Sequence, residues 1–134
     1  MIDYGFTTDL EADFDTVVGE VTARLKEAGF GVLTTIDVKA KFKEKLDIEF
    51  RRYTILGACN PHMAHQAIET EEDIGLMLPC NVIVCEKDGK THVAAIRPRA
   101  AMGMIDNPKL LEIAEKVEAS LKKVMDSLAR AAVK

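Results

Sequence analysis

The sequence predicts an α+β fold, a mostly antiparallel sheet with an N-terminal helix and a long C-terminal helix packed on it. Near both ends of the chain, apolar residues recur every three or four positions, which is the period of a helical face. Two strand-like segments flank Asp88-Gly89, a dipeptide typical of a tight antiparallel hairpin. The chain has 134 residues, 48% of them hydrophobic and 30% charged, so we expect a single domain over residues 1–134.

The N-terminal part is expected to form a strand and then a helix. Residues 2–7 read as a short strand, and apolar positions spaced at helical intervals follow over residues 14–28. Asp13 is a suitable N-cap for this helix. Gly29 is a suitable residue to end it, because glycine tolerates positive φ. Both ends of the helix are therefore marked in the sequence.

The middle of the chain is expected to alternate strands and helices. Residues 31–37 are rich in β-branched side chains, and residues 53–59 contain no charged residue, so both segments favour strands. Between them, residues 39–46 carry four lysines around two apolar residues and favour a short amphipathic helix. Residues 60–70 favour another helix, because an asparagine cap is followed by a proline, which needs no N–H in the first turn.

The hairpin around Asp88-Gly89 fixes a register between residues 82–86 and 91–96. A two-residue turn places Cys85 opposite His92. Because side chains alternate along a strand, Cys80 and Cys85 should lie on opposite faces of the sheet and cannot share a metal ion unless the chain bulges between them. We therefore expect Cys85 to be a core residue and His92 an ordinary strand residue.

The last helix is expected to begin at Asn107-Pro108 and to pack across the sheet. It would be about 35 Å long at 1.5 Å per residue. Further apolar side chains broaden its stripe beyond the narrow seam of a coiled coil. The stripe consists of Leu110, Ala114, Val117, Leu121, Val124 and Leu128.

Charge and composition exclude several classes of function. The formal net charge is -4, and residues 1–23 contain six acidic residues and no base, so a nucleic-acid partner is not expected. The chain has no apolar run long enough for a membrane span and no basic, apolar N-terminal signal. We expect a cytoplasmic protein. Its three cysteines are expected to be reduced rather than paired in disulfides.

Two motifs resemble the signature of a known family. Residues 56–61 read Leu-Gly-Ala-Cys-Asn-Pro, and residues 75–82 read Gly-Leu-Met-Leu-Pro-Cys-Asn-Val. Together they resemble the bacterial and archaeal domain of unknown function 302 family, over nearly the whole chain. The resemblance implies a TATA-binding-protein-like (TBP-like) layer, β-α-β4-α with an extra short helix, and a homodimer. The resemblance implies no reaction. The similarity of the fold to TATA-binding protein does not imply DNA binding, because this acidic chain lacks a basic, saddle-shaped surface.

We expect the two Cys-Asn turns to hold a small-molecule ligand. The ligand would lie between the sheet and the C-terminal helix or at a dimer interface, with the two asparagine amides pointing toward it. Alternatively, both asparagines only cap turns. The candidate ligand-binding residues are Cys59, Asn60, Pro61, His62, Cys80 and Asn81.

Two other functions stay open on the sequence. Cys59 lies at a helix start, which stabilises a thiolate, so a thiol-dependent enzyme could use it with His62 as base. Alternatively, Cys59, Cys80, His62 and His65 offer the sulfur and imidazole ligands that zinc prefers. The sequence does not decide whether the protein is an enzyme, which residues would be catalytic, or which metal or cofactor it holds.

Overall fold

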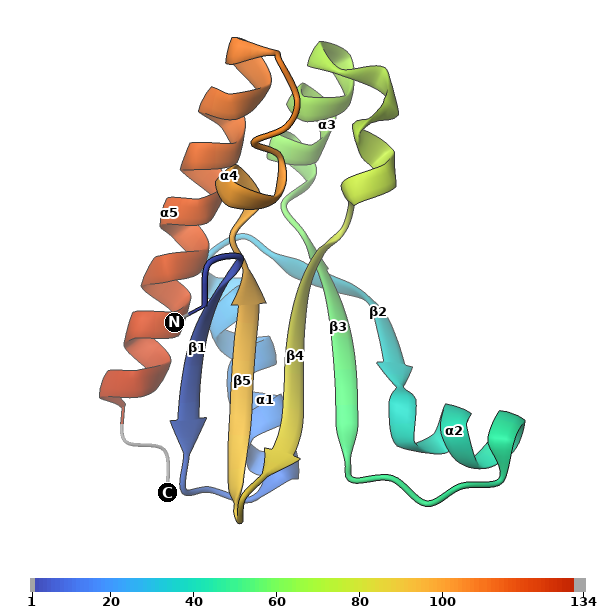
Figure 1. Cartoon of the computed structure of the whole chain (residues 1–134). Helices are drawn as coiled ribbons and strands as arrows, with labels where there is room; N and C mark the ends of the chain where they lie inside the picture. The colour runs from blue at the N-terminus through green and yellow to red at the C-terminus, as the bar shows by residue number, and fades with distance from the viewer. Residues whose placement is uncertain (1, 132–134) are drawn as a thin grey trace.

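The structure is a computed structural model that describes residues 2–131. Five strands form one sheet in the order β1-β5-β4-β3-β2, and every neighbouring pair is antiparallel (Figure 1). This confirms the predicted α+β class and the antiparallel sheet. The strands are β1 (Gly5–Leu10), β2 (Gly31–Asp37), β3 (Tyr53–Cys59), β4 (Cys80–Lys87) and β5 (Lys90–Ile96).

The helices divide into three groups. α1 and the C-terminal half of α5 pack on one face of the sheet, while α2 projects from its β2 edge (Figure 1). α3, the 3-10 helix η1, α4 and the N-terminal half of α5 form a cap beyond one end of the strands. Their bounds are α1 (Phe14–Glu27), α2 (Val38–Leu46), α3 (Pro61–Thr70), η1 (Glu72–Met77), α4 (Pro98–Ala101) and α5 (Pro108–Arg130).

The predicted helix boundaries are confirmed by the capping contacts. The Asp13 carboxylate accepts a hydrogen bond from the Thr16 N–H at 3.2 Å, and the Asn107 side chain accepts one from the Leu110 N–H, also at 3.2 Å. Gly29 follows α1 with a φ of 89°, a conformation that side chains with a Cβ rarely adopt. These local contacts explain why the ends of α1 and α5 were readable from the sequence.

The hairpin forms in the predicted register. Cys85 lies opposite His92 and Ile83 opposite Ala94. Asp88 and Gly89 have φ values of 51° and 77°, as a type I′ turn requires. The two strand cysteines therefore lie on opposite faces, as expected.

The first strand has other bounds than expected, the expected short helix is confirmed, and two short helices were not predicted. The first strand is β1 over residues 5–10 rather than 2–7, because its pairing with β5 runs from Gly5 opposite Ile96 to Leu10 opposite Thr91. The helix expected over 39–46 exists as α2, but none of its residues is buried, since it projects away from the sheet. α4 and η1 were not predicted, because helices of four and six residues are too short to show a period.

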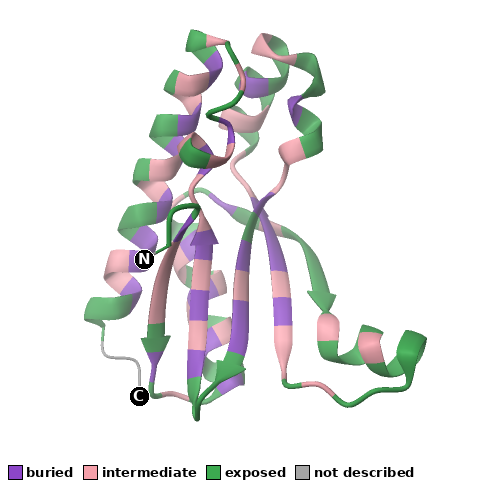
Figure 2. Ribbon diagram, in the orientation of Figure 1, coloured by how far each residue is buried: buried purple, intermediate pink, exposed green. Residues whose placement is uncertain are grey.

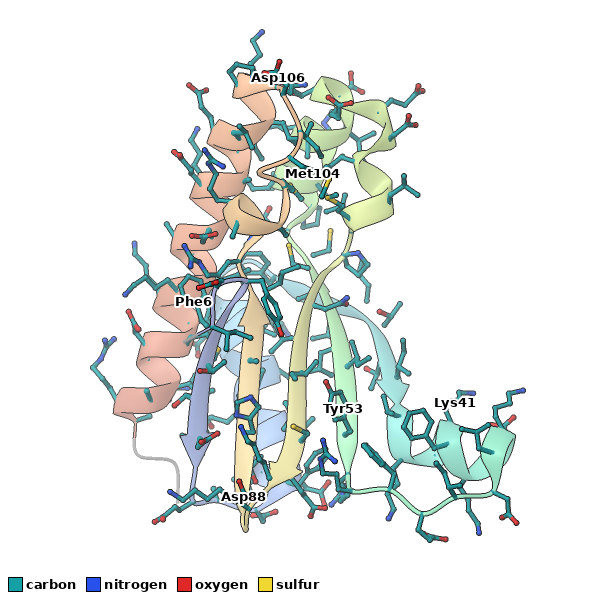
Figure 3. The ribbon with its side chains drawn as sticks, viewed as in Figure 1. Phe6, Lys41, Tyr53, Asp88, Met104 and Asp106 are labelled. Atoms are coloured by element: carbon teal, nitrogen blue, oxygen red, sulfur yellow. The ribbon has the colours of Figure 1, made fainter. Side chains whose placement is uncertain are left out.

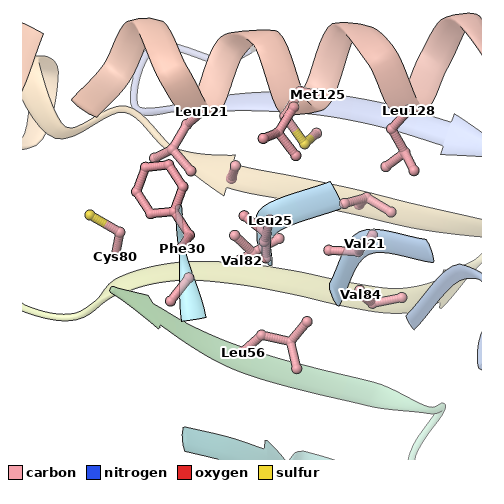
Figure 4. Packing of buried hydrophobic residues seen from close by; sticks show 14 of the residues in the cluster. Val21, Leu25, Phe30, Leu56, Cys80, Val82, Val84, Leu121, Met125 and Leu128 are labelled. Atoms are coloured by element: carbon pink, nitrogen blue, oxygen red, sulfur yellow. The ribbon is translucent and has the colours of Figure 1, made fainter. Parts of the chain in front are cut away.

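The main core lies between the sheet and helices α1 and α5. Leu25 of α1 and Leu121 of α5 are fully buried above Val82 and Val84 of β4 (Figure 4). A smaller cluster within the cap contains Ile74, Met102 and Leu110. The predicted apolar stripe of α5 joins the two clusters, because its first two members belong to the cap and the rest to the main core.

The opposite face of the sheet carries no helix over residues 2–131 (Figures 1 and 2). Its larger apolar side chains are half-buried. They include Tyr53 of β3 (Figure 3), Ile83 of β4 and Ile96 of β5. Cys85 also lies on this face, where it is 4% exposed. It is therefore buried, as expected of a core residue, although it lies outside the cluster on the helical side of the sheet. In the described residues, no helix combines the length and hydropathy needed to cross a membrane.

Candidate functional site

The two Cys-Asn motifs meet where the sheet joins the helical cap. β3 ends at Cys59, and the next residue caps α3. η1 leads the chain back into the sheet, and β4 begins at Cys80. Because Ala58 lies opposite Cys80 in the β3–β4 register, the two cysteines are close neighbours on adjacent strands.

A narrow apolar pocket lies at this junction. Its cavity volume is about 30 Å³, within a wider depression that is open to solvent. Its walls come from β3, β4, α3, α4 and α5, so it lies between the sheet and the cap. The pocket is lined by Phe30, Ala58, Cys59, Asn60, Met63, Ala64, Ala67, Leu78, Pro79, Cys80, Pro98, Met102, Leu110, Ile113, Ala114 and Val117.

Half of the six candidate ligand-binding residues line this pocket. Cys59, Asn60 and Cys80 do so. Pro61 and His62 are exposed on the first turn of α3 and are not among the lining residues. The sixth candidate, Asn81, is exposed and borders a separate groove on the uncovered sheet face, because it follows Cys80 directly and side chains alternate along β4.

The two pocket thiols are held in their neutral form. Burial raises the pKa of the Cys59 thiol. Burial and, second, the neighbouring Cys59 raise the pKa of the Cys80 thiol to about 11. Desolvation outweighs the stabilisation of a thiolate that the start of α3 was expected to give Cys59. At neutral pH the pocket therefore presents two uncharged, polarisable sulfur groups.

Asn60 acts as a cap. Its side-chain oxygen accepts a hydrogen bond from the Met63 N–H at 3.2 Å, which satisfies a backbone donor at the start of α3. The same residue lines the pocket, so its amide nitrogen remains the polar group next to the apolar walls. The capping interpretation and the ligand interpretation are thus compatible for this residue.

The histidines do not complete either alternative site. The His65 side chain is 77% exposed and lies 3.6 Å from the Glu69 carboxylate. In residues 2–131, no three or more His, Cys, Asp or Glu side chains are grouped closely enough to hold a metal ion. The four-ligand zinc hypothesis is therefore wrong for these residues. His62 also makes no hydrogen bond to Cys59 among the described contacts, so the pair lacks the geometry of an activated nucleophile.

A close approach between strands supports one wall of the pocket. A Cβ placed on Gly57 of β3 would lie 2.7 Å from Cγ of Pro79 and would also overlap the Thr34 side chain. Glycine is therefore the residue that lets Pro79 lie against the sheet beside Cys80. This gives a physical reason for the glycine two residues before Cys59.

Sequence reasoning missed the walls that come from α4 and α5. Met102 follows α4, which was too short to predict. Leu110 and Ala114 were recognised as members of the apolar stripe, but a stripe does not show that part of it faces a cavity instead of close-packed neighbours. Only the crossing of α5 over the sheet end reveals that.

The comparisons with known proteins agree on one family. The family model described as "Domain of unknown function DUF302" matches residues 6–128. A solved structure of an uncharacterized conserved protein DUF302 from Bacillus stearothermophilus is 31% identical, covering 92% of this chain and 96% of that chain, with a TM-score of 0.85. A comparison with curated proteins gives no match.

Proposed function

The chain belongs to the domain of unknown function DUF302 family, and from its pocket we propose that it binds a small, uncharged, apolar molecule between the two Cys-Asn turns. One observation carries the proposal: the two motifs, about 20 residues apart in sequence, line the same apolar pocket. Cys59 and Asn60 come from the first motif, and Pro79 and Cys80 from the second.

The lining of the pocket supports an apolar ligand. None of the described lining residues is charged, and most are aliphatic, aromatic or sulfur-containing. The cavity itself is narrow, about 30 Å³, so a small ligand would extend from it into the depression that opens to solvent. A charged ligand would lose its hydration there without gaining an ionic partner. The Asn60 amide and the two thiols are the groups that would orient an uncharged ligand.

Filling the pocket tests the proposal. Ala64 is half-buried on α3 and lines the pocket, so Ala64→Leu places an isobutyl group in the space that a ligand would occupy. Ala129 is exposed on α5 outside the pocket, so Ala129→Leu is a matched control. The probe is the uncharged dye N-phenyl-1-naphthylamine, whose fluorescence rises in an apolar environment.

We expect saturable dye binding to the unmodified protein and to Ala129→Leu, and at least tenfold weaker binding to Ala64→Leu, which corresponds to about 1.4 kcal/mol. Equal binding to all three proteins, or binding that never saturates, would contradict the proposal. Native mass spectrometry of the purified protein would in addition show whether a small molecule is retained.

The homodimer that the family resemblance implies stays a prediction. Sedimentation equilibrium should give a mass near twice the 14.8 kDa of one chain. A mass of one chain at all accessible concentrations would contradict it.

A further inference from the structure

Four sulfur-containing side chains line the cavity between the sheet and the cap. They are Cys59, Met63, Cys80 and Met102. Among the described residues, the same walls carry no charged side chain and no histidine, and Asn60 is their one polar residue besides the thiols. The cavity is therefore rich in soft sulfur groups and offers no carboxylate to a hard metal ion.

Cys59 and Cys80 are neighbours in this cavity. Cys80 lies opposite Ala58, the residue before Cys59, in the β3–β4 register, and both cysteines line the cavity. Burial raises the pKa of the Cys80 thiol, and the nearby Cys59 raises it further, so the two groups interact electrostatically. Neither cysteine is in a disulfide. The cavity thus presents two free thiols to one ligand.

Met63 adds a thioether to the two thiols. Its N–H donates to the Asn60 side chain at 3.2 Å, which fixes the first turn of α3 directly after Cys59. The Met63 side chain is half-buried, lines the cavity and packs against the main core cluster, to which Cys80 belongs. Met102 belongs to the cap cluster instead. Three sulfur groups therefore reach one cavity from β3, α3 and β4.

The cavity has the size of an ion. Its volume is about 30 Å³, and a cavity of roughly 10 to 15 Å³ already holds one water molecule. An organic ligand has to extend into the outer depression, whereas a single metal ion fits inside. Cys80 is 8% exposed and lies beside Phe30 at the end of the main core (Figure 4), so an ion bound to it is shielded from water.

The sulfur ligands favour a soft monovalent ion. Thiolate and thioether sulfur are ligands that copper(I) prefers, whereas calcium and magnesium ions require oxygen. A structural zinc site uses four Cys, His or carboxylate ligands. The described residues do not bring even a third such ligand to the two thiols. Copper(I), by contrast, is satisfied by two or three sulfur ligands.

We propose that Cys59, Cys80 and Met63 form a copper(I) site within the Cys-Asn pocket. As the ion binds, each thiol releases its proton to water and its sulfur bonds to copper, while the Met63 sulfur donates a lone pair. The copper stays in the copper(I) state, and no electron is transferred. The proposal goes beyond the binding of an organic molecule and does not depend on it.

The charges at the site balance. A charged organic ligand finds no ionic partner in this pocket, but copper(I) gains two thiolates when the thiols release their protons. The bound site then carries one net negative charge. Cys59 directly precedes the cap of α3, and the free N–H groups and the dipole at the start of a helix stabilise negative charge.

Copper(I) titration of the full chain tests the site. The reduced protein competes for copper(I) with bathocuproine disulfonate under anaerobic conditions, with ascorbate as reductant. We expect the protein to take up one copper ion per chain, with only sulfur neighbours in its X-ray absorption spectrum. Failure to withdraw copper(I) from the competitor, or nitrogen or oxygen neighbours, would overturn the proposal.

Matched variants separate the three ligands from the other sulfur groups. Cys59→Ser and Cys80→Ser should each weaken copper(I) binding by about 10²-fold or more, and Met63→Leu by about tenfold. Cys85→Ala removes a thiol on the other face of the sheet, and Met104→Leu a thioether that is 83% exposed, so both should bind like the unmodified protein. Unchanged binding in any of the first three variants, or loss in either control, would overturn the three-sulfur assignment.

Two further measurements separate the possible failures. Thermal melting shows whether each variant folds, and if Cys80→Ser does not fold, Cys59→Ser decides, because its side chain is only half-buried. Naphthylamine binding reports on the organic ligand independently. A protein that binds the dye but no copper(I) overturns this inference alone, and one that binds copper(I) but no dye overturns the proposed function alone.

Discussion

Replacing Gly57 by alanine should strain the wall of the Cys-Asn pocket. The added Cβ would lie 2.7 Å from Cγ of Pro79, well inside van der Waals contact, and would overlap the Thr34 side chain. Gly57 has no positive φ, so the substitution strains no backbone dihedral and its cost is steric. The exposed Thr34 side chain can rotate away, but the Pro79 ring cannot move without moving the turn that leads into Cys80.

The expected magnitude follows from these contacts. Overpacking of this kind costs about 1 to 3 kcal/mol. A domain of this length loses roughly 3 to 5 °C in Tm for each kcal/mol, so Gly57→Ala should lower Tm by about 3 to 15 °C. Naphthylamine binding should weaken as well, because Pro79 lines the pocket.

Circular dichroism melting curves provide the measurement. Gly19 is the matched control, because a Cβ there meets no atom within 4 Å and the residue lies inside α1. Gly19→Ala should therefore raise stability by about 0.5 to 1 kcal/mol. In a double-mutant cycle, Thr34→Ala should remove only part of the cost of Gly57→Ala, since the contact with Pro79 remains. An unchanged Tm in Gly57→Ala, or full recovery in the double variant, would refute the steric argument.

Three further predictions concern the packing of the core, the reactivity of the Cys80 thiol and the loss of stability at acid pH. Leu121 is 0% exposed and Leu76 is 90% exposed. In urea unfolding, Leu121→Ala should lower the free energy of unfolding by about 2 to 5 kcal/mol, and Leu76→Ala by less than about 0.5 kcal/mol. Similar losses in the two variants would contradict the packing of α5 on the sheet. Because its pKa is about 11, Cys80 in the folded protein should react with iodoacetamide more slowly than Cys59, and its reaction rate should rise as the pH approaches 11. Peptide mass spectrometry measures the two rates. A Cys80 rate equal to that in the unfolded chain would contradict its burial. The His92 hydrogen bond lowers the pKa of Asp9 below 3.8, so the ionised carboxylate should stabilise the fold above about pH 4, and this stabilisation should disappear as the pH falls through the lowered pKa. In urea unfolding, Asp9→Asn should therefore reduce the loss of stability between about pH 4 and lower pH. An unchanged loss of stability at acid pH in Asp9→Asn would contradict the assignment.

Much of the fold could be predicted because its signals are local. Asp13, Asn60 and Asn107 each satisfy a backbone N–H within the first turn of the helix that follows, so the residues that start each helix are adjacent in sequence. Asp88-Gly89 fixes the β4–β5 register through the conformation of two residues. The features of the fold that the sequence did not predict depend on contacts with segments distant in sequence. β1 is bounded by its pairing with β5, and α2 buries none of its residues in the described chain.

The candidate site was predictable only in part. The sequence indicated that Cys59 and Cys80 belong together, and both line the pocket. It did not place His62 and His65, because the direction of an exposed side chain on α3 depends on where that helix lies against α5. It also did not bring Asp9 to His92, because Asp9 comes from a strand more than 70 residues earlier.

By itself, the sequence determined the local structure and the family: the capped helices, the hairpin, the stripe of α5 and the two Cys-Asn motifs. The tertiary structure decided the environment of each chemical group. It placed two thiols in an apolar pocket, where burial keeps them protonated, and it added β1 next to β5, so that a carboxylate meets His92. Helix caps and turns depend on neighbours in sequence, whereas burial, pKa and cross-strand pairing depend on which distant segments pack together.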